Sequence, residues 1–274
     1  MKLDALFQNP TALPTAPKVV EELISSFDKA SVSTEEIAKK LSTDPVLSAK
    51  LLRLANSAYY HVSRSIGTVE DAVLMLGFVT VRTLVISSGL VSGFKTVPGL
   101  DLKQFWRYSL HTAVSAKWIA KQCGENTDLA FTIGMMHSIG QLVIHSAMPE
   151  QAMALDKVAG PLDSRRIDAE MSSFGYSFAD VGAELARRWK FPTTFSETIS
   201  AFPNPLTPEV NRLAAVVHLA AWRARVEDGK LTEEEIASCY PTEIADALGL
   251  APNALVDKMP SPDELSAGLE DLVR

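Results

Sequence analysis

Apolar side chains recur at intervals of three and four residues along most of this chain, with polar residues between them. Clear cases are Leu47, Leu51 and Leu54, and then Val69, Val73 and Leu76. This spacing places apolar side chains on one face of an α-helix, because a helix turns once in about 3.6 residues. The pattern therefore predicts an all-α protein.

Residues that can cap helix ends stand just before these apolar stripes. The expected helix starts are Thr15 or Ala16, Ser33 with Glu36, Asp44 with Pro45, Thr68 with Asp71, and Ser261 with Pro262 and Glu264. The side-chain oxygen of a capping residue accepts hydrogen bonds from first-turn amides that have no partner inside the helix. Gly124 predicts the end of an alanine-rich helix over 105–122, because glycine readily adopts a left-handed conformation.

The segment 79–86 is ambiguous, since it reads Val-Thr-Val-Arg-Thr-Leu-Val-Ile. Its β-branched residues favour a strand. Every neighbouring segment is helical, however, and a single strand would have no partner with which to pair. We therefore predict a helix here as well.

Helices are also expected through the second half of the chain. Their predicted ranges are 128–147, 149–155, 164–173, 178–190, 210–225, 231–248 and 261–273. The segment 128–147 is apolar nearly all round, which is typical of a central buried helix. Val97-Pro98-Gly99 is the best candidate for a boundary. We expect an N-terminal helical lobe over 1–98 and a second helical lobe over 99–274 that ends in peripheral helices.

Composition narrows the class of protein. The 274 residues carry a net charge of −7, which argues against a broad nucleic-acid surface. The two cysteines, Cys123 and Cys239, lack metal-binding spacing and indicate a reducing compartment. Neither a signal peptide nor an apolar run of membrane-spanning length is found. We expect a cytoplasmic protein that binds neither nucleic acid nor membrane.

Several sequence blocks occur in an order that is typical of one family. They are Leu13-Pro14-Thr15, Ser42-Thr43-Asp44-Pro45, 50–58 (Lys-Leu-Leu-Arg-Leu-Ala-Asn-Ser-Ala), 65–68 (Ser-Ile-Gly-Thr), 72–77 (Ala-Val-Leu-Met-Leu-Gly), 105–110 (Phe-Trp-Arg-Tyr-Ser-Leu), Met136-His137-Ser138-Ile139-Gly140, Val181-Gly182-Ala183 and Trp189-Lys190-Phe191-Pro192. Through these blocks, residues 10–255 resemble HDOD-domain proteins. The resemblance implies a helical N-terminal lobe followed by a helical fold of the HD superfamily.

Enzymes of the HD superfamily are metal-dependent phosphohydrolases, including phosphodiesterases that hydrolyse cyclic di-GMP, and they hold metal with histidines and aspartates. The resemblance implies that most of these ligands are absent here. Tyr108, Phe178, Phe202 and Pro203 stand where histidines are expected, and Ser138 stands where an aspartate is expected. Only His137 keeps a group that could bind a metal, and a divalent ion needs about three protein ligands. We therefore expect no metal, no other cofactor and no catalytic residue.

Other histidines are open to structural interpretations. His111 follows Tyr108 by one helical turn, so both side chains could face the same cavity. We expect His137 to donate to a backbone carbonyl inside the core. His145 follows His137 by eight residues and could share its helix face, although chance spacing or an exposed position is expected instead. His218 is expected to be a packing residue.

Two further groups of residues leave alternatives open. The aromatic rings of Tyr108, Phe178 and Phe202 would either pack as core in place of the metal site or line a remodelled pocket. Two basic clusters, Arg187-Arg188 with Lys190 and Arg223 with Arg225, are typical of solvated helix faces, although either could contact a phosphate.

The combined interpretation is a non-catalytic bacterial signal-transduction protein of HDOD type. It would act through contacts with other signalling proteins in trans, with cyclic di-GMP enzymes as candidate partners, and no small-molecule ligand is identified. One alternative is a divergent metal-dependent phosphohydrolase that uses ligands such as His111, His137, His145, Asp128 or Asp180. Another alternative is a nucleotide-sensing module that binds without hydrolysis.

Overall fold

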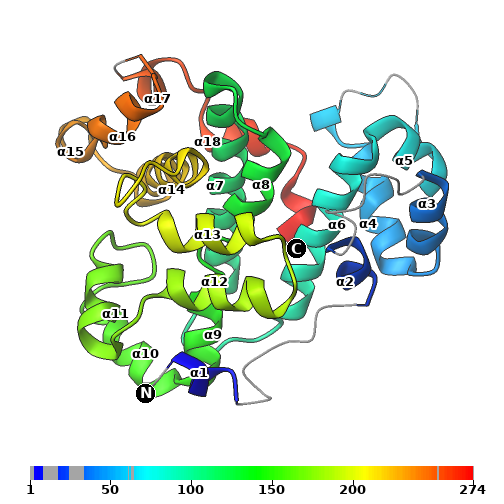
Figure 1. Ribbon diagram of the computed structural model, residues 1–274. Helices are drawn as coiled ribbons and strands as arrows, with labels where there is room; N and C mark the ends of the chain where they lie inside the picture. Colours follow the sequence, from blue (N-terminus) through cyan, green and yellow to red (C-terminus); the bar gives the residue numbers. More distant parts are fainter. Residues whose placement is uncertain are drawn as a thin grey trace.

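The computed structural model describes residues 3–8, 18–24, 34–60, 62, 65–251 and 253–273. Every regular element in this part of the chain is a helix, which confirms the all-α prediction (Figure 1). The first elements are α1 (Leu3–Leu6), α2 (Lys18–Ile24), α3 (Thr34–Ser42), α4 (Pro45–Ala55), the 3-10 turn η1 (Ala58–Tyr60), α5 (Val69–Leu76) and α6 (Phe78–Gly93).

The second part of the chain surrounds a central pair of helices. Its elements are α7 (Leu102–Cys123), α8 (Thr127–Met136), α9 (Ile139–Ala147), α10 (Pro149–Asp156), α11 (Arg166–Phe174), α12 (Phe178–Arg188), α13 (Thr193–Ala201), α14 (Arg212–Gly229), α15 (Glu233–Cys239), α16 (Thr242–Ala247), α17 (Ala254–Asp257), α18 (Pro262–Ser266) and the 3-10 turn η2 (Glu270–Val273). Helix α7 packs along α8 and α14, while α12 packs against α9 and α13 (Figure 1). Helix α6 also contacts α8, and so connects the first helices to this core.

Three of the predicted helix starts are confirmed by their caps. The carboxylate of Asp44 accepts from the amides of Val46 and Leu47 at 2.9 and 3.1 Å. Thr68 caps α5, and Ser261 caps α18 through a reciprocal capping box. These side chains satisfy first-turn amides that the helix itself leaves without partners.

The ambiguous segment 79–86 lies within α6 and is helical, as predicted. Residues from Val81 to Val91 in this helix are almost all buried, so β-branched side chains fill the core rather than a sheet face. Helix α5 meets α6 at Gly77, whose φ of 77° is a left-handed conformation that favours glycine. The starts predicted at Thr15 or Ala16 and at Ser33 lie outside the described residues.

The single helix predicted over 128–147 is wrong, because the chain forms two helices that meet at His137 and Ser138. Ser138 has φ −107° and ψ 8°, which interrupts the helical path. Beyond it, Gly140 lies so close to α12 that a Cβ would stand 2.0 Å from the carbonyl oxygen of Phe178 and 2.8 Å from the amide nitrogen of Gly182. The apolar pattern does not reveal this junction, because residues 130–145 are buried on every side of both helices.

The range predicted as one helix over 231–248 is also divided, into α15 and α16, at Tyr240 and Pro241. Proline removes an amide donor and commonly ends a helix. The final range, 261–273, holds α18 and the separate turn η2.

The predicted boundary at Val97-Pro98-Gly99 lies between α6 and α7. Turn η2, at the other end of the described chain, packs against α4, α6 and α7. There Arg53 forms an ion pair with Asp271 at 3.3 Å. The division into lobes over 1–98 and 99–274 stays a prediction.

Within the described residues, no individual helix is both long enough and apolar enough to cross a membrane. Helices α5 and α6 meet those criteria only when taken together, and they are bent by 115° at Gly77.

Candidate functional site

Four of the residues singled out from the sequence form one buried cluster. Tyr108 comes from α7, His137 from the α8–α9 junction, Phe178 from the start of α12 and Phe202 from the end of α13. The His137 ring lies edge to face with Tyr108 and with Phe202, at centroid distances of 5.2 and 5.4 Å. Phe202 also contacts Phe178 at 5.9 Å. Such ring pairs add a favourable contact to the area they bury.

His137 is a neutral core histidine. Its Nδ1 lies 2.7 Å from the carbonyl oxygen of Gly134, which is the backbone contact predicted for it. Nδ1 therefore carries the proton, and Nε2 is an acceptor that has no hydrogen-bond partner among the described residues. Burial, aided by the positive charge of Arg225 and opposed by the hydrogen bond to Gly134, lowers the pKa of His137 to about 4.

Ser138 lies next to this cluster but adds no charge to it. The side chain is 1% exposed, and its Oγ has no hydrogen-bond partner in the part of the chain that the structure describes. No group of three or more His, Cys, Asp or Glu residues within that part is arranged to hold a metal ion.

His111 lies in a different set of contacts from its neighbour Tyr108. Its Nδ1 is 3.3 Å from Asp228 on α14, and its Nε2 is 3.1 Å from Asp263 on α18. Arg107, one turn earlier on α7, pairs with the same two carboxylates at 3.4 and 3.2 Å. The sequence suggested that Tyr108 and His111, one turn apart on one helix, could face the same cavity. In the structure His111 contacts two aspartates, whereas Tyr108 packs in the aromatic cluster. The two aspartates were not singled out from the sequence.

The prediction that His145 is exposed is wrong, since its side chain has no exposed surface. Its Nδ1 lies 3.0 Å from the carbonyl oxygen of Pro98, and its Nε2 lies 3.4 Å from a guanidinium nitrogen of Arg166. Arg166 also pairs with Asp156 and, at 2.7 Å, with Glu170. Burial lowers the pKa of His145. The only sequence signal for this network was the four-residue spacing of Arg166 and Glu170.

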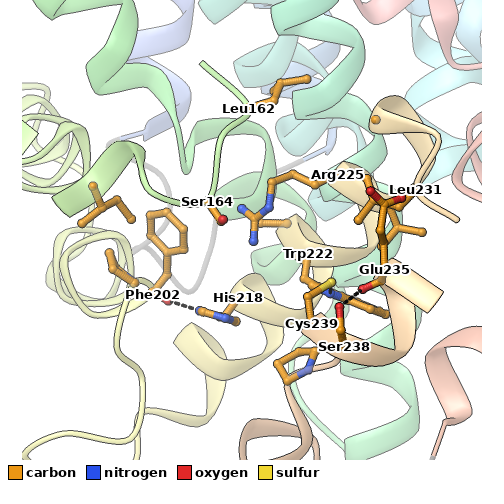
Figure 2. A pocket seen from close by; sticks show the side chains of 16 residues that line it. Leu162, Ser164, Phe202, His218, Trp222, Arg225, Leu231, Glu235, Ser238 and Cys239 are labelled. Atoms are coloured by element: carbon orange, nitrogen blue, oxygen red, sulfur yellow. Dashed lines mark hydrogen bonds between the residues drawn. The ribbon is translucent and has the colours of Figure 1, made fainter. Parts of the chain in front are cut away.

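A cavity of about 520 Å³ lies beside the aromatic cluster. Figure 2 shows the side chains that line it. Phe202 belongs to both, and further walls come from α14, α15 and the segment that leads into α11. A guanidinium nitrogen of Arg225 lies 3.5 Å from the Tyr108 hydroxyl, which itself lies 3.4 Å from the carbonyl oxygen of Ala221. Burial raises the pKa of Tyr108, so this phenol keeps its proton at neutral pH.

His218 forms another part of the cavity wall. Its Nδ1 lies 2.8 Å from the carbonyl oxygen of Phe202, as Figure 2 shows. Burial lowers the pKa of His218, so the ring is neutral near pH 7. Arg225 is therefore the group that carries positive charge in this cavity wall.

The sequence profile of the HDOD domain matches residues 13–205. The chain belongs to the HDOD domain family. A protein of Shewanella amazonensis SB2B, provisionally named a phosphohydrolase, is 32% identical to this HDOD chain. Its crystal structure superposes with a TM-score of 0.77, and the match covers 98% of both chains. The resemblance inferred from the sequence blocks is thereby confirmed.

Two more distant structures share the fold. An HDOD domain protein of unknown function from Geobacter sulfurreducens is 24% identical, with a TM-score of 0.72 over 98% of this chain and 93% of that one. A provisionally named signal transduction protein of Marinobacter aquaeolei VT8 is 22% identical, with a TM-score of 0.72 over 97% of this chain and 59% of that one.

Among curated proteins, an uncharacterized protein of Treponema pallidum (strain Nichols) is 28% identical over 230 residues. The match covers 82% of this chain and 44% of the relative, so the matched region spans less than half of that protein's length.

Proposed function

We propose that this HDOD protein is a non-catalytic regulatory protein that acts through contacts with other signalling proteins. The observation that carries the proposal is the enclosure of His137 by the rings of Tyr108 and Phe202. A catalytic metal needs several protein ligands and one open position for water or substrate. At this junction the space around the remaining imidazole holds aromatic carbon instead.

Local charge supports the same interpretation. A divalent cation is stabilised by carboxylates, and Ser138 supplies only a neutral hydroxyl next to His137. The positive charge of Arg225 is close enough to lower the pKa of His137, so it would also repel a cation bound there.

The histidines of the phosphohydrolase alternative belong to separate networks. His137 packs among aromatic rings, His111 contacts Asp228 and Asp263, and His145 contacts Pro98. One ion cannot use all three imidazoles without breaking the contacts that each of them makes. This separation favours a regulatory role over hydrolysis.

The corner between α5 and α6 is a candidate surface for a partner protein. Leu74, Met75 and Val79 are 66%, 39% and 41% exposed around Gly77. Neighbouring exposed apolar side chains are typical of protein contact sites. We propose that this apolar corner, defined by Leu74, Met75 and Val79, receives an apolar surface of a signalling protein. Enzymes of cyclic di-GMP metabolism are candidate partners.

The decisive experiment is elemental analysis of the purified protein after incubation with Mn²⁺, Fe²⁺, Mg²⁺ or Zn²⁺ and removal of free metal. We expect far less than one metal per chain, and no difference between the wild-type protein and His137→Ala. About one or two metals per chain, lost on His137→Ala, would overturn the proposal. That result would favour the phosphohydrolase alternative, which hydrolysis of bis(4-nitrophenyl) phosphate would then test.

A further inference from the structure

The cavity beside the aromatic cluster contains a cation without a carboxylate partner. Arg225 forms no ion pair within the described residues, and its guanidinium donates a 3.5 Å hydrogen bond to the neutral Tyr108 hydroxyl. Arg223, two positions earlier on α14, is paired with Glu227 at 3.1 Å. The two arginines look equivalent in sequence, yet only Arg225 lies in this cavity wall. A half-buried guanidinium gains strongly from an anionic partner, because charge-assisted hydrogen bonds are among the strong ones.

The charge of Arg225 acts on its surroundings. It lowers the pKa of His137 in the aromatic cluster and of His218 in the cavity wall. It also lowers the pKa of Asp163, whose carboxylate is already paired with Arg165 at 2.7 Å. An anion bound at Arg225 would weaken these effects.

The remaining wall of the cavity suits an apolar body. Phe202, Ile167, Trp222 and Leu231 supply aromatic and aliphatic surface. The volume of about 520 Å³ lies in the usual range for sites that bind small organic molecules. Trp222 is held in place by the bond from its Nε1 to the sulfur of Cys239, at 3.3 Å.

The charge balance of the cavity limits the ligand to one negative charge. Glu235 on α15 also lines the cavity, and its carboxylate accepts from the amide and hydroxyl of Thr232 in a capping box. One arginine facing a cavity that already contains this carboxylate suits a monoanion better than a polyphosphate. The neutral His218 ring adds no second positive charge.

We propose that this cavity, between α14, α15 and the segment before α11, binds an organic monoanion with a flat apolar body. Arg225 binds the carboxylate, sulfonate or phosphodiester group, while Trp222 and Phe202 contact the body (Figure 2). The ligand would lie directly against the aromatic cluster through Phe202. This inference goes beyond the proposed function, which needs no ligand.

A pair of matched probes tests the proposal on the full chain. 8-Anilinonaphthalene-1-sulfonate is a flat aromatic monoanion, and N-phenyl-1-naphthylamine has the same body without the charge. We expect saturable one-to-one binding of the anion by calorimetry and fluorescence, and binding of the neutral probe that is at least about tenfold weaker. Equal affinity for the two probes, or no saturable binding of the anion, would overturn the proposal.

Variants then test whether Arg225 is the residue that binds the anionic group of the probe. Arg225→Gln should lower the affinity for the anionic probe at least about tenfold, and Arg225→Lys should lower it less. The matched control is Arg223→Gln, which removes the same charge from α14 outside this cavity and should leave affinity within about twofold. Equal losses for the 225 and 223 variants would show non-specific attraction and contradict the site. Circular dichroism establishes that each variant is folded, and if Arg225→Gln is not, the comparison of the two probes on wild-type protein decides.

Cysteine alkylation provides an independent readout of location. Cys239 lines the cavity and is exposed, whereas Cys123 lies elsewhere, on α7. The anionic probe should slow the reaction of Cys239 with iodoacetamide and leave that of Cys123 unchanged. Equal rates at Cys239 with and without the probe would place the binding site elsewhere and refute the inference. None of these readouts depends on metal content or on a partner protein, so a negative result leaves the proposed regulatory function unaffected.

Discussion

The backbone amide of Phe178 donates a 2.5 Å hydrogen bond to Oε2 of Glu170, a carboxylate with no exposed surface. The other oxygen of Glu170 accepts from Nε of Arg166 at 2.7 Å. Glu170 thereby connects α11 to the first residue of α12. The side chain of that residue belongs to the aromatic cluster, so this ion pair also helps to position the cluster.

Removal of the Glu170 charge should destabilise the protein strongly. Glu170→Gln leaves the buried Arg166 with Asp156 as its remaining carboxylate partner. We expect the free energy of unfolding in urea to fall by about 3 kcal/mol, the usual cost of breaking a buried pair. Glu184→Gln, which loses exposed pairs with Arg187 and Arg188 on α12, is the matched control and should cost less than about 1 kcal/mol. Similar losses for the two variants would contradict the role of burial.

The depressed pKa of His137 predicts acid sensitivity. Unfolding restores the ring to a pKa near 6.5, whereas the folded value is about 4. Above pH 6.5 the ring is neutral in both states and contributes nothing to the pH dependence. As the pH falls from there towards 4, only the unfolded chain takes up the proton, so stability decreases by roughly 3 kcal/mol in total.

Urea unfolding at about pH 7.5 and about pH 4.5 measures this effect. His137→Gln retains an amide donor for Gly134 but does not titrate, so its loss of stability on acidification should be roughly 2 to 3 kcal/mol smaller than that of the wild type. His145 and His218 also have lowered pKa values and remain in both proteins. An identical acid-induced loss in the variant would refute the prediction.

The close contact at Gly140 predicts that even one added methyl group is not tolerated. Gly140→Ala would place a Cβ 2.0 Å from the carbonyl oxygen of Phe178, and main-chain atoms cannot rotate away. We expect a loss of roughly 3 kcal/mol or more in unfolding free energy, or failure to fold. Gly160→Ala is the control, because nothing lies within 4 Å of its added Cβ. Soluble yield and melting temperature of the two variants provide the comparison.

A carboxylate restored at Ser138 should destabilise the site instead of creating a metal centre. Ser138→Asp buries a charge that lacks a partner, so we expect a loss of several kcal/mol in unfolding free energy at neutral pH. Ser138→Ala should be nearly neutral, because the serine hydroxyl makes no hydrogen bond within the described residues. Thermal melts with and without Mn²⁺ test both points. Strong stabilisation of Ser138→Asp by Mn²⁺ would contradict this prediction, because it would show that other residues of the protein join the new carboxylate as metal ligands.

The apolar corner should matter for partner binding and little for folding. Leu74→Asp alters a side chain that is 66% exposed, so stability should change by less than about 0.5 kcal/mol. Affinity for a partner identified by crosslinking in cells should drop at least about tenfold, since a charge would enter an apolar contact. Val158→Asp, at an equally exposed apolar position outside the corner (68%), is the control. Equal effects of the two substitutions, or none from Leu74→Asp, would remove the corner from the proposed function.

Local sequence signals predicted much of the fold. Helix starts such as Asp44 and Thr68 could be predicted because a cap involves only residues within one turn. The junction at His137 and Ser138 could not, because apolar residues flank it on both sides and the close contact of Gly140 with α12 joins segments far apart in sequence. The short helix α13, which positions Phe202, was also missed.

The site could be predicted in part. Family-like blocks indicated Tyr108, His137, Phe178 and Phe202, which the fold brings into contact. Burial of His145 depends on partners that lie elsewhere in sequence, at Pro98 and Arg166, so no local pattern reveals it. The difference between Arg223 and Arg225 likewise depends on which helix face meets a cavity.

The contact between α9 and α12 at Gly140 and Gly182 holds the two helices at a fixed distance beside the junction. Main-chain atoms touch there, so the distance between the two helices is set without reference to the side chains at Ser138 and Phe178. Exchange of those side chains changes what the junction can bind while the frame around it keeps its dimensions. The chemistry of this junction is therefore set by which side chains it carries, and not by how far apart α9 and α12 lie.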